Sequence, residues 1–317
     1  MRAADPLDGT PILIERGDRS YWYAKLRIGE RTVQRYIGPD SPDLRERMAR
    51  ARADRKDAHD FDRHCGVLAA QLRAAMLPAP DRTTARILDA MAKVGVFRLG
   101  GTLVGTHAFR MYDSVLGLRV TRQSLAVTED VDIAAFERLT LVLDDNVSPS
   151  LAEGFAELRL TPTLSIHKRQ RTAHWHMPGS TTRVDFLTPS FEDDEGLREL
   201  KSLGVWAQSL HFLNFLIAEP ISAVAIHRSG TLVQIPRPER YAVHKLIVSQ
   251  RRRGPNRLKA RKDLGQAAAL IDALAEDRPS ELLDAYETAR NKGPKWREAL
   301  DAALAAAPLT KAAIDRL

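Results

Sequence analysis

Two aspartates separated by one residue stand in the segment 128–133, which reads Thr-Glu-Asp-Val-Asp-Ile. If this segment is a strand, alternation places Asp130 and Asp132 on one face and the apolar residues between and after them on the other. Neighbouring carboxylates repel each other, and a divalent cation such as Mg²⁺ or Mn²⁺ relieves that repulsion through oxygen ligands. An exposed strand can also carry such a pair without any metal, so the prediction of a metal site needs support from elsewhere in the chain.

Two further segments give that support. Gly100, Gly101 and Thr102 follow a short apolar run that predicts a strand, and glycines let backbone amides approach a phosphate closely. Asp185 stands among apolar strand residues in 183–187, where a charge is costly unless it is paired or liganded. The alternatives are an ordinary tight turn at the glycines and an ion pair between Asp185 and Arg183.

Taken in this order, the glycine turn, the Asp-x-Asp pair and the later Asp resemble the DNA polymerase beta-type nucleotidyltransferase superfamily. The resemblance covers residues 97–187 and implies an α+β fold, a mixed sheet flanked by helices. It also implies two-metal phosphoryl transfer. Asp130, Asp132 and Asp185 would bind magnesium, and Gly100 to Thr102 would hold the triphosphate of a bound NTP.

The tail extends the likeness. Residues 236–247 and the pair Lys262-Asp263 resemble an uncharacterised bacterial branch of nucleotidyltransferase-fold proteins, related to abortive-infection toxins. By this match Lys245 and Asp263 belong to the active site, and Lys245 would neutralise charge on the phosphates. The alternative for Lys245 is a solvated helix face.

The resemblance implies transfer of NMP from an NTP, such as ATP, to an acceptor hydroxyl with release of pyrophosphate. RNA, for example a tRNA-like molecule, is the acceptor that the charge favours, because 48 Lys and Arg exceed 41 Asp and Glu for a net charge of +7. Aromatic residues at 21–23 are interleaved with basic ones, and a second basic run spans 251–262. The alternatives are nucleotidylation (AMP transfer) of a protein or small molecule, and a non-catalytic toxin–antitoxin or binding component that keeps the fold.

The order of elements predicts three parts. Residues 1–77 form a basic β-meander with strands near 11–15, 21–27 and 32–37, followed by helices at 44–63 and 65–76. Residues 78–236 form the catalytic core, which ends in a hairpin at 223–235. Residues 237–317 form a helical unit.

Cysteine and histidine usage narrows the remaining chemistry. The single cysteine, Cys65, cannot form an internal disulfide or a zinc finger, which favours reducing cytoplasm. No apolar run approaches the roughly 20 residues of a membrane span. His174 and His176 would share one strand face, and we expect strand packing or substrate contact there rather than a metal site.

Overall fold

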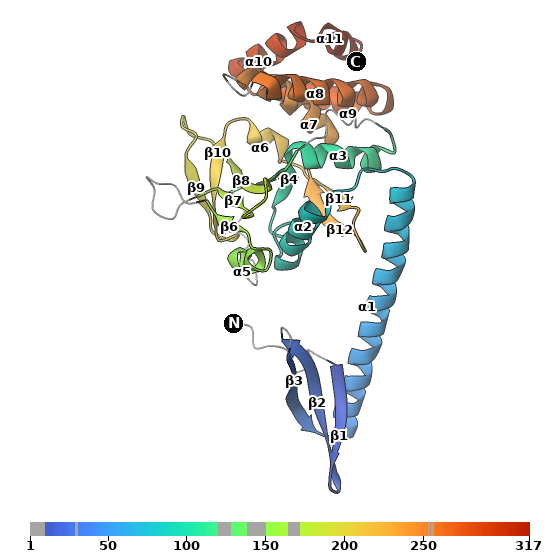
Figure 1. Cartoon of the computed structure of the whole chain (residues 1–317). Coiled ribbons are helices and arrows are strands. Elements are labelled where there is room, and N and C mark those ends of the chain that lie inside the picture. The colour runs from blue at the N-terminus through green and yellow to red at the C-terminus, as the bar shows by residue number, and fades with distance from the viewer. Residues whose placement is uncertain are drawn as a thin grey trace. The chain divides into compact units, whose positions relative to one another are not determined.

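The computed structural model describes residues 10–28, 31–119, 128–137, 150–163, 172–252, 254 and 257–317. The chain divides into two compact units, Met1–Leu68 and Ala69–Leu317. Helix α1 (Pro42–Ala74) starts in the first unit and ends in the second. We call them unit 1 and unit 2 (Figure 1).

Unit 1 contains an antiparallel meander of strands β1 (Thr10–Arg16), β2 (Arg19–Ile28) and β3 (Arg31–Pro39). This confirms the three strands expected there. The two helices expected after the meander form the single helix α1, because Gly66 interrupts the helical pattern at a cost of only about 1 kcal/mol. Leu44 and Met48 on α1 bury Trp22 of β2, so one face of the meander is the core of unit 1.

Unit 2 is built on a mixed sheet flanked by helices, as the sequence predicts. Its strands among the described residues are β4 (Thr102–Val104), β5 (Asp130–Ala134), β6 (Thr161–Pro162), β7 (His174–His176), β8 (Arg183–Pro189), β9 (Leu197–Leu200) and β10 (Val205–Leu210). The order is β4-β5-β8-β10-β9, with β7 also on β8 and β6 on β7. Strands β5, β8 and β10 are parallel, whereas β4, β7 and β9 pair antiparallel with their neighbours.

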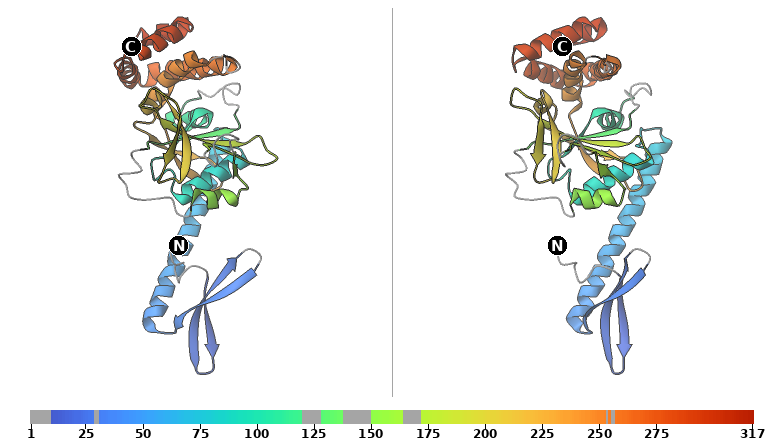
Figure 2. Two further views of the ribbon diagram at one scale, coloured as in Figure 1. Left: turned by 90° about the vertical axis from the view of Figure 1, so that its left-hand side faces the viewer. Right: turned by 60° about the vertical axis from the view of Figure 1, so that its left-hand side comes forward.

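Helices and a hairpin surround this sheet (Figure 2). They are α2 (Arg82–Val94), α3 (Gly105–Leu116), α5 (Leu151–Ala156), α6 (Leu213–Leu216), the hairpin β11 (Ile221–Ala225) and β12 (Thr231–Ile235), α7 (Pro238–Arg251), α8 (Arg257–Asp277), α9 (Pro279–Arg290), α10 (Pro294–Ala305) and α11 (Pro308–Ile314). The predicted hairpin and the helical structure predicted for residues 237–317 are confirmed. Helices α8 to α11 gather on one side of the sheet.

One strand prediction is wrong. The apolar residues around Phe97 form turns, not a strand, and regular pairing begins only at Thr102. Asp81 caps the start of α2, Gly95 ends it at a φ of 95°, and the chain then folds back so that Gly101 donates its amide to the carbonyl of Val96. Phe97 is buried in this compact turn. A short apolar run does not by itself distinguish a strand from another buried segment.

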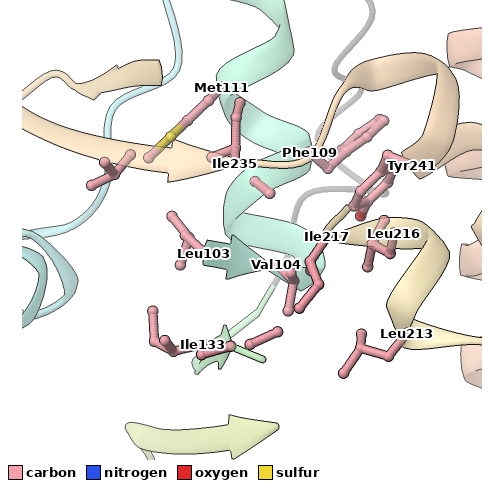
Figure 3. Packing of buried hydrophobic residues seen from close by; sticks show 14 of the residues in the cluster. Leu103, Val104, Phe109, Met111, Ile133, Leu213, Leu216, Ile217, Ile235 and Tyr241 are labelled. Carbon is pink, nitrogen blue, oxygen red and sulfur yellow. The ribbon is translucent and has the colours of Figure 1, made fainter. Parts of the chain in front are cut away.

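The core of unit 2 lies between the sheet and the helices. Leu103 and Ile133, from the paired strands β4 and β5, belong to the same buried cluster as Leu213 and Leu216 of α6 (Figure 3). Tyr241 of α7 stacks on Phe109 of α3, their ring centroids 6.2 Å apart. This packing fixes α3, α6 and α7 against the strands that carry the aspartates.

Candidate active site

The three predicted aspartates lie on two neighbouring strands. In the parallel pair of β5 and β8, Asp132 is directly opposite Asp185, and Asp130 is opposite Arg183. The residues that alternate with them, including Val131 and Val184, are fully buried in the core. Because residues opposite each other share a face of the sheet, the carboxylates of Asp130, Asp132 and Asp185 emerge on the same face.

Two cationic or ionisable side chains contact these carboxylates. The Arg183 Nε atom lies 2.9 Å from Asp185 Oδ1, and its Nη2 atom lies 3.4 Å from Asp130 Oδ2. His174, opposite Asp185 on β7, places Nδ1 2.7 Å from the same Asp185 Oδ1. The ion pair that the sequence offered as an alternative for Asp185 therefore forms. His176 instead lies 3.2 Å from the hydroxyl of Thr163.

Asp132 has no such direct partner among the residues that the structure describes, and its ionisation is disfavoured. Burial, then the charges of Asp185 and Asp130, raise the pKa of Asp132 from 3.8 to about 7. Arg183 and Lys245 oppose this shift only in part. Among the described residues no group of three or more His, Cys, Asp or Glu side chains is arranged to hold a metal ion. The carboxylates nevertheless form a concentration of like charge that a divalent cation would relieve.

A glycine that we did not single out from the sequence lies against Asp132. Gly105, the first residue of α3, has a φ of 66°, and a Cβ built there would overlap the Oδ2 atom of Asp132. The residue before it, Val104, offers no side-chain cap, so the first amides of α3 have no capping side chain. Gly105 and Thr106 both line the cavity described below. The sequence feature that could have indicated Gly105 is the repeated Gly-Thr dipeptide, which occurs at 101–102 and again at 105–106.

The predicted glycine turn lies elsewhere. Gly100, Gly101 and Thr102 are absent from the described residues that line the cavity. A Cβ on Gly101 would come within 2.6 Å of Val96 Cγ1, so this glycine permits close packing of the turn after α2. Thr102 is 1% exposed and pairs with Ala134. The structure does not bring these three residues to the carboxylates.

The opposite wall of the site is basic. The Lys245 Nζ atom lies 2.6 Å from Asp263 Oδ1, and Arg252 Nε lies 2.9 Å from Asp263 Oδ2. Burial opposes ionisation of Asp263, but Lys245 and then Arg252 hold its pKa below the usual value. The Lys245 ammonium also lies 5.3 Å from the ring centroid of Tyr241. Burial and then the charge of Lys245 lower the pKa of His244 to about 3, so this wall owes its positive charge to lysine and arginine.

These elements enclose a cavity of about 710 Å³. Its lining combines three kinds of side chain: the carboxylates on β5 and β8, basic residues on and between α7 and α8, and an apolar group. The apolar group comprises Leu187, Leu210, Leu213, Leu216 and Val248. Lys245 and Asp263 line the same cavity as Asp130, Asp132 and Asp185. Such a site can hold a cation, a polyanion and a flat apolar group side by side.

A family model described as Nucleotidyltransferase matches residues 82–291. The chain belongs to this nucleotidyltransferase family, and it is an enzyme of this class. No curated protein matches the sequence. Among solved structures it is similar to an antigenic nucleotidyltransferase-like protein from Paracoccidioides brasiliensis, with 15% identity, a TM-score of 0.30, and coverage of 76% of this chain and 92% of that chain.

The matched region of the nucleotidyltransferase extends from α2 to the end of α9. It therefore includes both walls of the cavity and all five residues predicted as catalytic. The match does not distinguish the branch of abortive-infection toxins, so that relation stays a prediction. No helix in the described part of the nucleotidyltransferase is long and apolar enough to cross a membrane.

Proposed function

We propose that this nucleotidyltransferase moves NMP from an NTP to an acceptor hydroxyl in a magnesium-dependent reaction that releases pyrophosphate. The observation that carries the proposal is the shared face of Asp130, Asp132 and Asp185, which opens into a cavity also lined by Lys245. Family membership supports NMP transfer in general. The geometry supports the assignment of roles to particular residues, which we derive below.

Asp130, Asp132 and Asp185 have the ligand chemistry that a divalent cation prefers. They offer only oxygen ligands, which suit Mg²⁺ or Mn²⁺, and burial together with their mutual repulsion raises the pKa of Asp132. Arg183 pairs with Asp130 and Asp185, and His174 contacts Asp185. When bound, the cations would supply positive charge that stabilises the transferring phosphate and lowers the pKa of the acceptor hydroxyl. Arg183 would have to release Asp130 and Asp185 for all three carboxylates to bind.

The NTP triphosphate would bind at the start of α3. We assign this contact to the backbone amides of Gly105 and Thr106, because they line the cavity beside Asp132, whereas Gly100, Gly101 and Thr102 do not. An uncapped helix N-terminus favours anions through its amides and its dipole. On the other wall, Lys245 would neutralise charge on the phosphates, held in place by Asp263. The apolar group would contact the base.

In the reaction, the acceptor oxygen attacks the α-phosphorus of the NTP. A new P–O bond forms to the acceptor, and the bond between the α-phosphorus and the bridging oxygen breaks, so pyrophosphate leaves. Asp185 would take the proton of the acceptor hydroxyl, either directly or through water. The contact of His174 with Asp185 fixes the orientation of that carboxylate.

RNA is the acceptor that we propose, with a tRNA-like molecule as the example. The net charge is +7, and the cavity is lined by Arg251, Arg252, Lys259 and Lys262. Basic residues at an active-site rim attract a polyanion. The hydroxyl of a protein or of a small molecule is the alternative, and the same assay distinguishes the acceptors.

The test uses each of the four NTPs labelled at the α-phosphate, Mg²⁺, and either total RNA or cell extract. We expect label in RNA and release of pyrophosphate by the wild type. Asp132→Asn should lower the rate by at least about 100-fold, as loss of charge stabilisation in a phosphoryl-transfer site does. Asp193→Asn, which changes an exposed aspartate outside the cavity, is the matched control.

Each outcome has a defined meaning. Label in a protein band or a small molecule would replace RNA as the acceptor but keep the reaction. Absence of label with every NTP and both mixtures would refute NMP transfer to the acceptors tested. An Asp132→Asn enzyme that transfers NMP as fast as the wild type would refute the assignment of the site.

A further inference from the structure

The meander of unit 1 has two different faces. On β2, Trp22 and Ala24 are buried toward α1, which contributes Leu44 and Met48 to the small core. Tyr21 and Tyr23 alternate with them and therefore lie on the other face. The described residues of unit 1 include no helix on that second face, because α1 covers the first (Figures 1 and 2).

Three tyrosines cluster on this second face. The ring centroid of Tyr36, on β3, lies 5.5 Å from that of Tyr23 and 6.1 Å from that of Tyr21. The planes are inclined by 67° and 52°, so the rings do not stack on one another and leave surfaces free. Tyr36 is 53% exposed. We call Tyr21, Tyr23 and Tyr36 the tyrosine face.

Such a cluster calls for an explanation. Tyr36 is exposed, and Tyr21 and Tyr23 are half-buried. Single exposed apolar residues are common on protein surfaces, but a contiguous group of accessible aromatic rings marks an interaction site. The core of unit 1 does not use these rings, since it is complete with Trp22, Ile37, Leu44 and Met48. The hydroxyl groups permit contact with water while the rings remain available to a flat partner.

Charge identifies the kind of partner. Residues 10–39 carry six Lys and Arg against three Asp and Glu. Three exposed basic residues lie on the side of the tyrosine face: Arg16, Arg19 and Lys25. Arg19 and Lys25 share the odd-numbered positions of β2 with Tyr21 and Tyr23, and Arg16 of β1 is opposite Arg19. The Arg16 guanidinium lies 5.7 Å from the ring centroid of Tyr23. A flat aromatic surface edged by positive charge complements a polyanion whose own flat groups are free to stack.

Single-stranded nucleic acid has that chemistry. Its unpaired bases stack on tyrosine rings, and its phosphates pair with arginine and lysine. In a duplex the bases are stacked inside, so the rings of a sheet face cannot reach them, and phosphate contacts alone remain. The clustering of rings therefore favours a single strand over a duplex.

We propose that the tyrosine face binds single-stranded RNA, with Tyr23 and Tyr36 stacking on successive bases and with Arg16 and Lys25 contacting phosphates. That this strand belongs to the acceptor rests on the proposed function. The binding itself requires neither NTP nor Mg²⁺, and can be measured without them.

The experiment uses the full chain and a fluorescent single-stranded RNA of about 12 nucleotides, within the range that one such surface contacts. The Kd is measured by anisotropy without NTP or Mg²⁺. We expect Tyr36→Ala to raise the Kd by about fivefold to 100-fold, and Tyr36→Phe to leave it within about twofold, because stacking requires the ring and not the hydroxyl. Phe191→Ala is the matched control: Phe191 is 68% exposed but lies in unit 2.

A second variant keeps the test decisive if Tyr36→Ala alters the fold of unit 1, which circular dichroism would reveal. Arg16→Gln changes an exposed side chain. It should lower the slope of log Kd against log salt concentration by about 0.7, the value for one lost phosphate contact to a single strand. An unchanged Kd in both Tyr36→Ala and Tyr23→Ala would overturn the proposal. So would equal affinity for a blunt RNA duplex, and equal affinity for single-stranded DNA would overturn the choice of RNA.

The two proposals fail independently. Asp132→Asn should abolish NMP transfer and leave the Kd for the single-stranded RNA unchanged. If Tyr36→Ala leaves the Kd unchanged while NMP transfer to RNA persists, the tyrosine face is wrong and the proposed function stands. If the tyrosine face binds RNA as expected but no NTP labels that RNA, the tyrosine face stands and the proposed NMP transfer to RNA is wrong.

Discussion

Asp132→Asn should stabilise the cation-free protein at neutral and alkaline pH. The raised pKa of Asp132, from 3.8 to about 7, means that the folded protein holds this proton more tightly than the unfolded chain does. Between those values the folded state binds more protons, so the free energy of unfolding falls as pH rises through this range and stays low above it. Asparagine carries no charge and has nearly the same shape, so the variant escapes this loss.

The magnitude follows from the shift. A change of about three pKa units corresponds to at most about 4 kcal/mol, at about 1.36 kcal/mol per unit. Part of this destabilisation is already present at about pH 5, where the unfolded chain has lost the proton, and solvent screening reduces the part that develops at higher pH. We therefore expect the stability advantage of Asp132→Asn to grow by about 1 to 2 kcal/mol between about pH 5 and about pH 8. For a unit of this size that is roughly 2 to 8 °C in Tm.

The assay is urea unfolding followed by tryptophan fluorescence, with EDTA present. Three of the four tryptophans, Trp175, Trp206 and Trp296, lie in unit 2 and report its unfolding. Added Mg²⁺ at about pH 8 should then stabilise the wild type more than Asp132→Asn, because the cation neutralises the charge that the variant lacks. Asp193→Asn should follow the wild type at every pH.

The reasoning is refuted if the difference between Asp132→Asn and the wild type is the same at both pH values. That result would mean that burial and the neighbouring carboxylates do not raise the pKa of Asp132 in the folded protein. Equal stabilisation of both proteins by Mg²⁺ would refute a role of Asp132 as a ligand.

Three further perturbations test the rest of the site. Gly105→Ala and Gly117→Ala both place alanine at positive φ, 66° and 68°, which should cost about 1 to 2 kcal/mol of stability each. Only at Gly105 would the new Cβ overlap a carboxylate, that of Asp132, so NMP transfer should fall by about 100-fold in Gly105→Ala alone. Lys245→Ala should lower NMP transfer by about 100-fold and the free energy of unfolding by about 1 to 3 kcal/mol, because buried Asp263 loses one of its two cationic partners. Lys311→Ala, at an exposed position, should change neither quantity in rate assays and unfolding curves. Deleting residues 1–77, which precede the matched region, should leave the NTP affinity measured by calorimetry unchanged but remove the salt-sensitive affinity for RNA. A truncated protein that aggregates would contradict the prediction that NTP binding does not need these residues.

Some features of this nucleotidyltransferase follow from local sequence alone. Alternation is a property of any strand, so the common face of Asp130 and Asp132 could be predicted without the fold. The meander, the hairpin and the tail helices follow from local periodicity in the same way. The apolar neighbours of Asp185 indicated that residue, the family resemblance added Lys245 and Asp263, and the structure gathers all three around one cavity.

Only the tertiary structure decides how distant segments meet. The register of β5 on β8 places Asp185 beside Asp132, and β7 brings His174 to the same carboxylate. Two Gly-Thr steps are locally equivalent, yet only Gly105 lies at a helix start against Asp132. Likewise, the sequence offers Tyr21, Trp22 and Tyr23 as a single aromatic run, and packing on α1 decides which of these rings are left for a partner. The physical reason is that these choices depend on long-range pairing and burial, whose free energy comes from contacts between segments far apart in the chain.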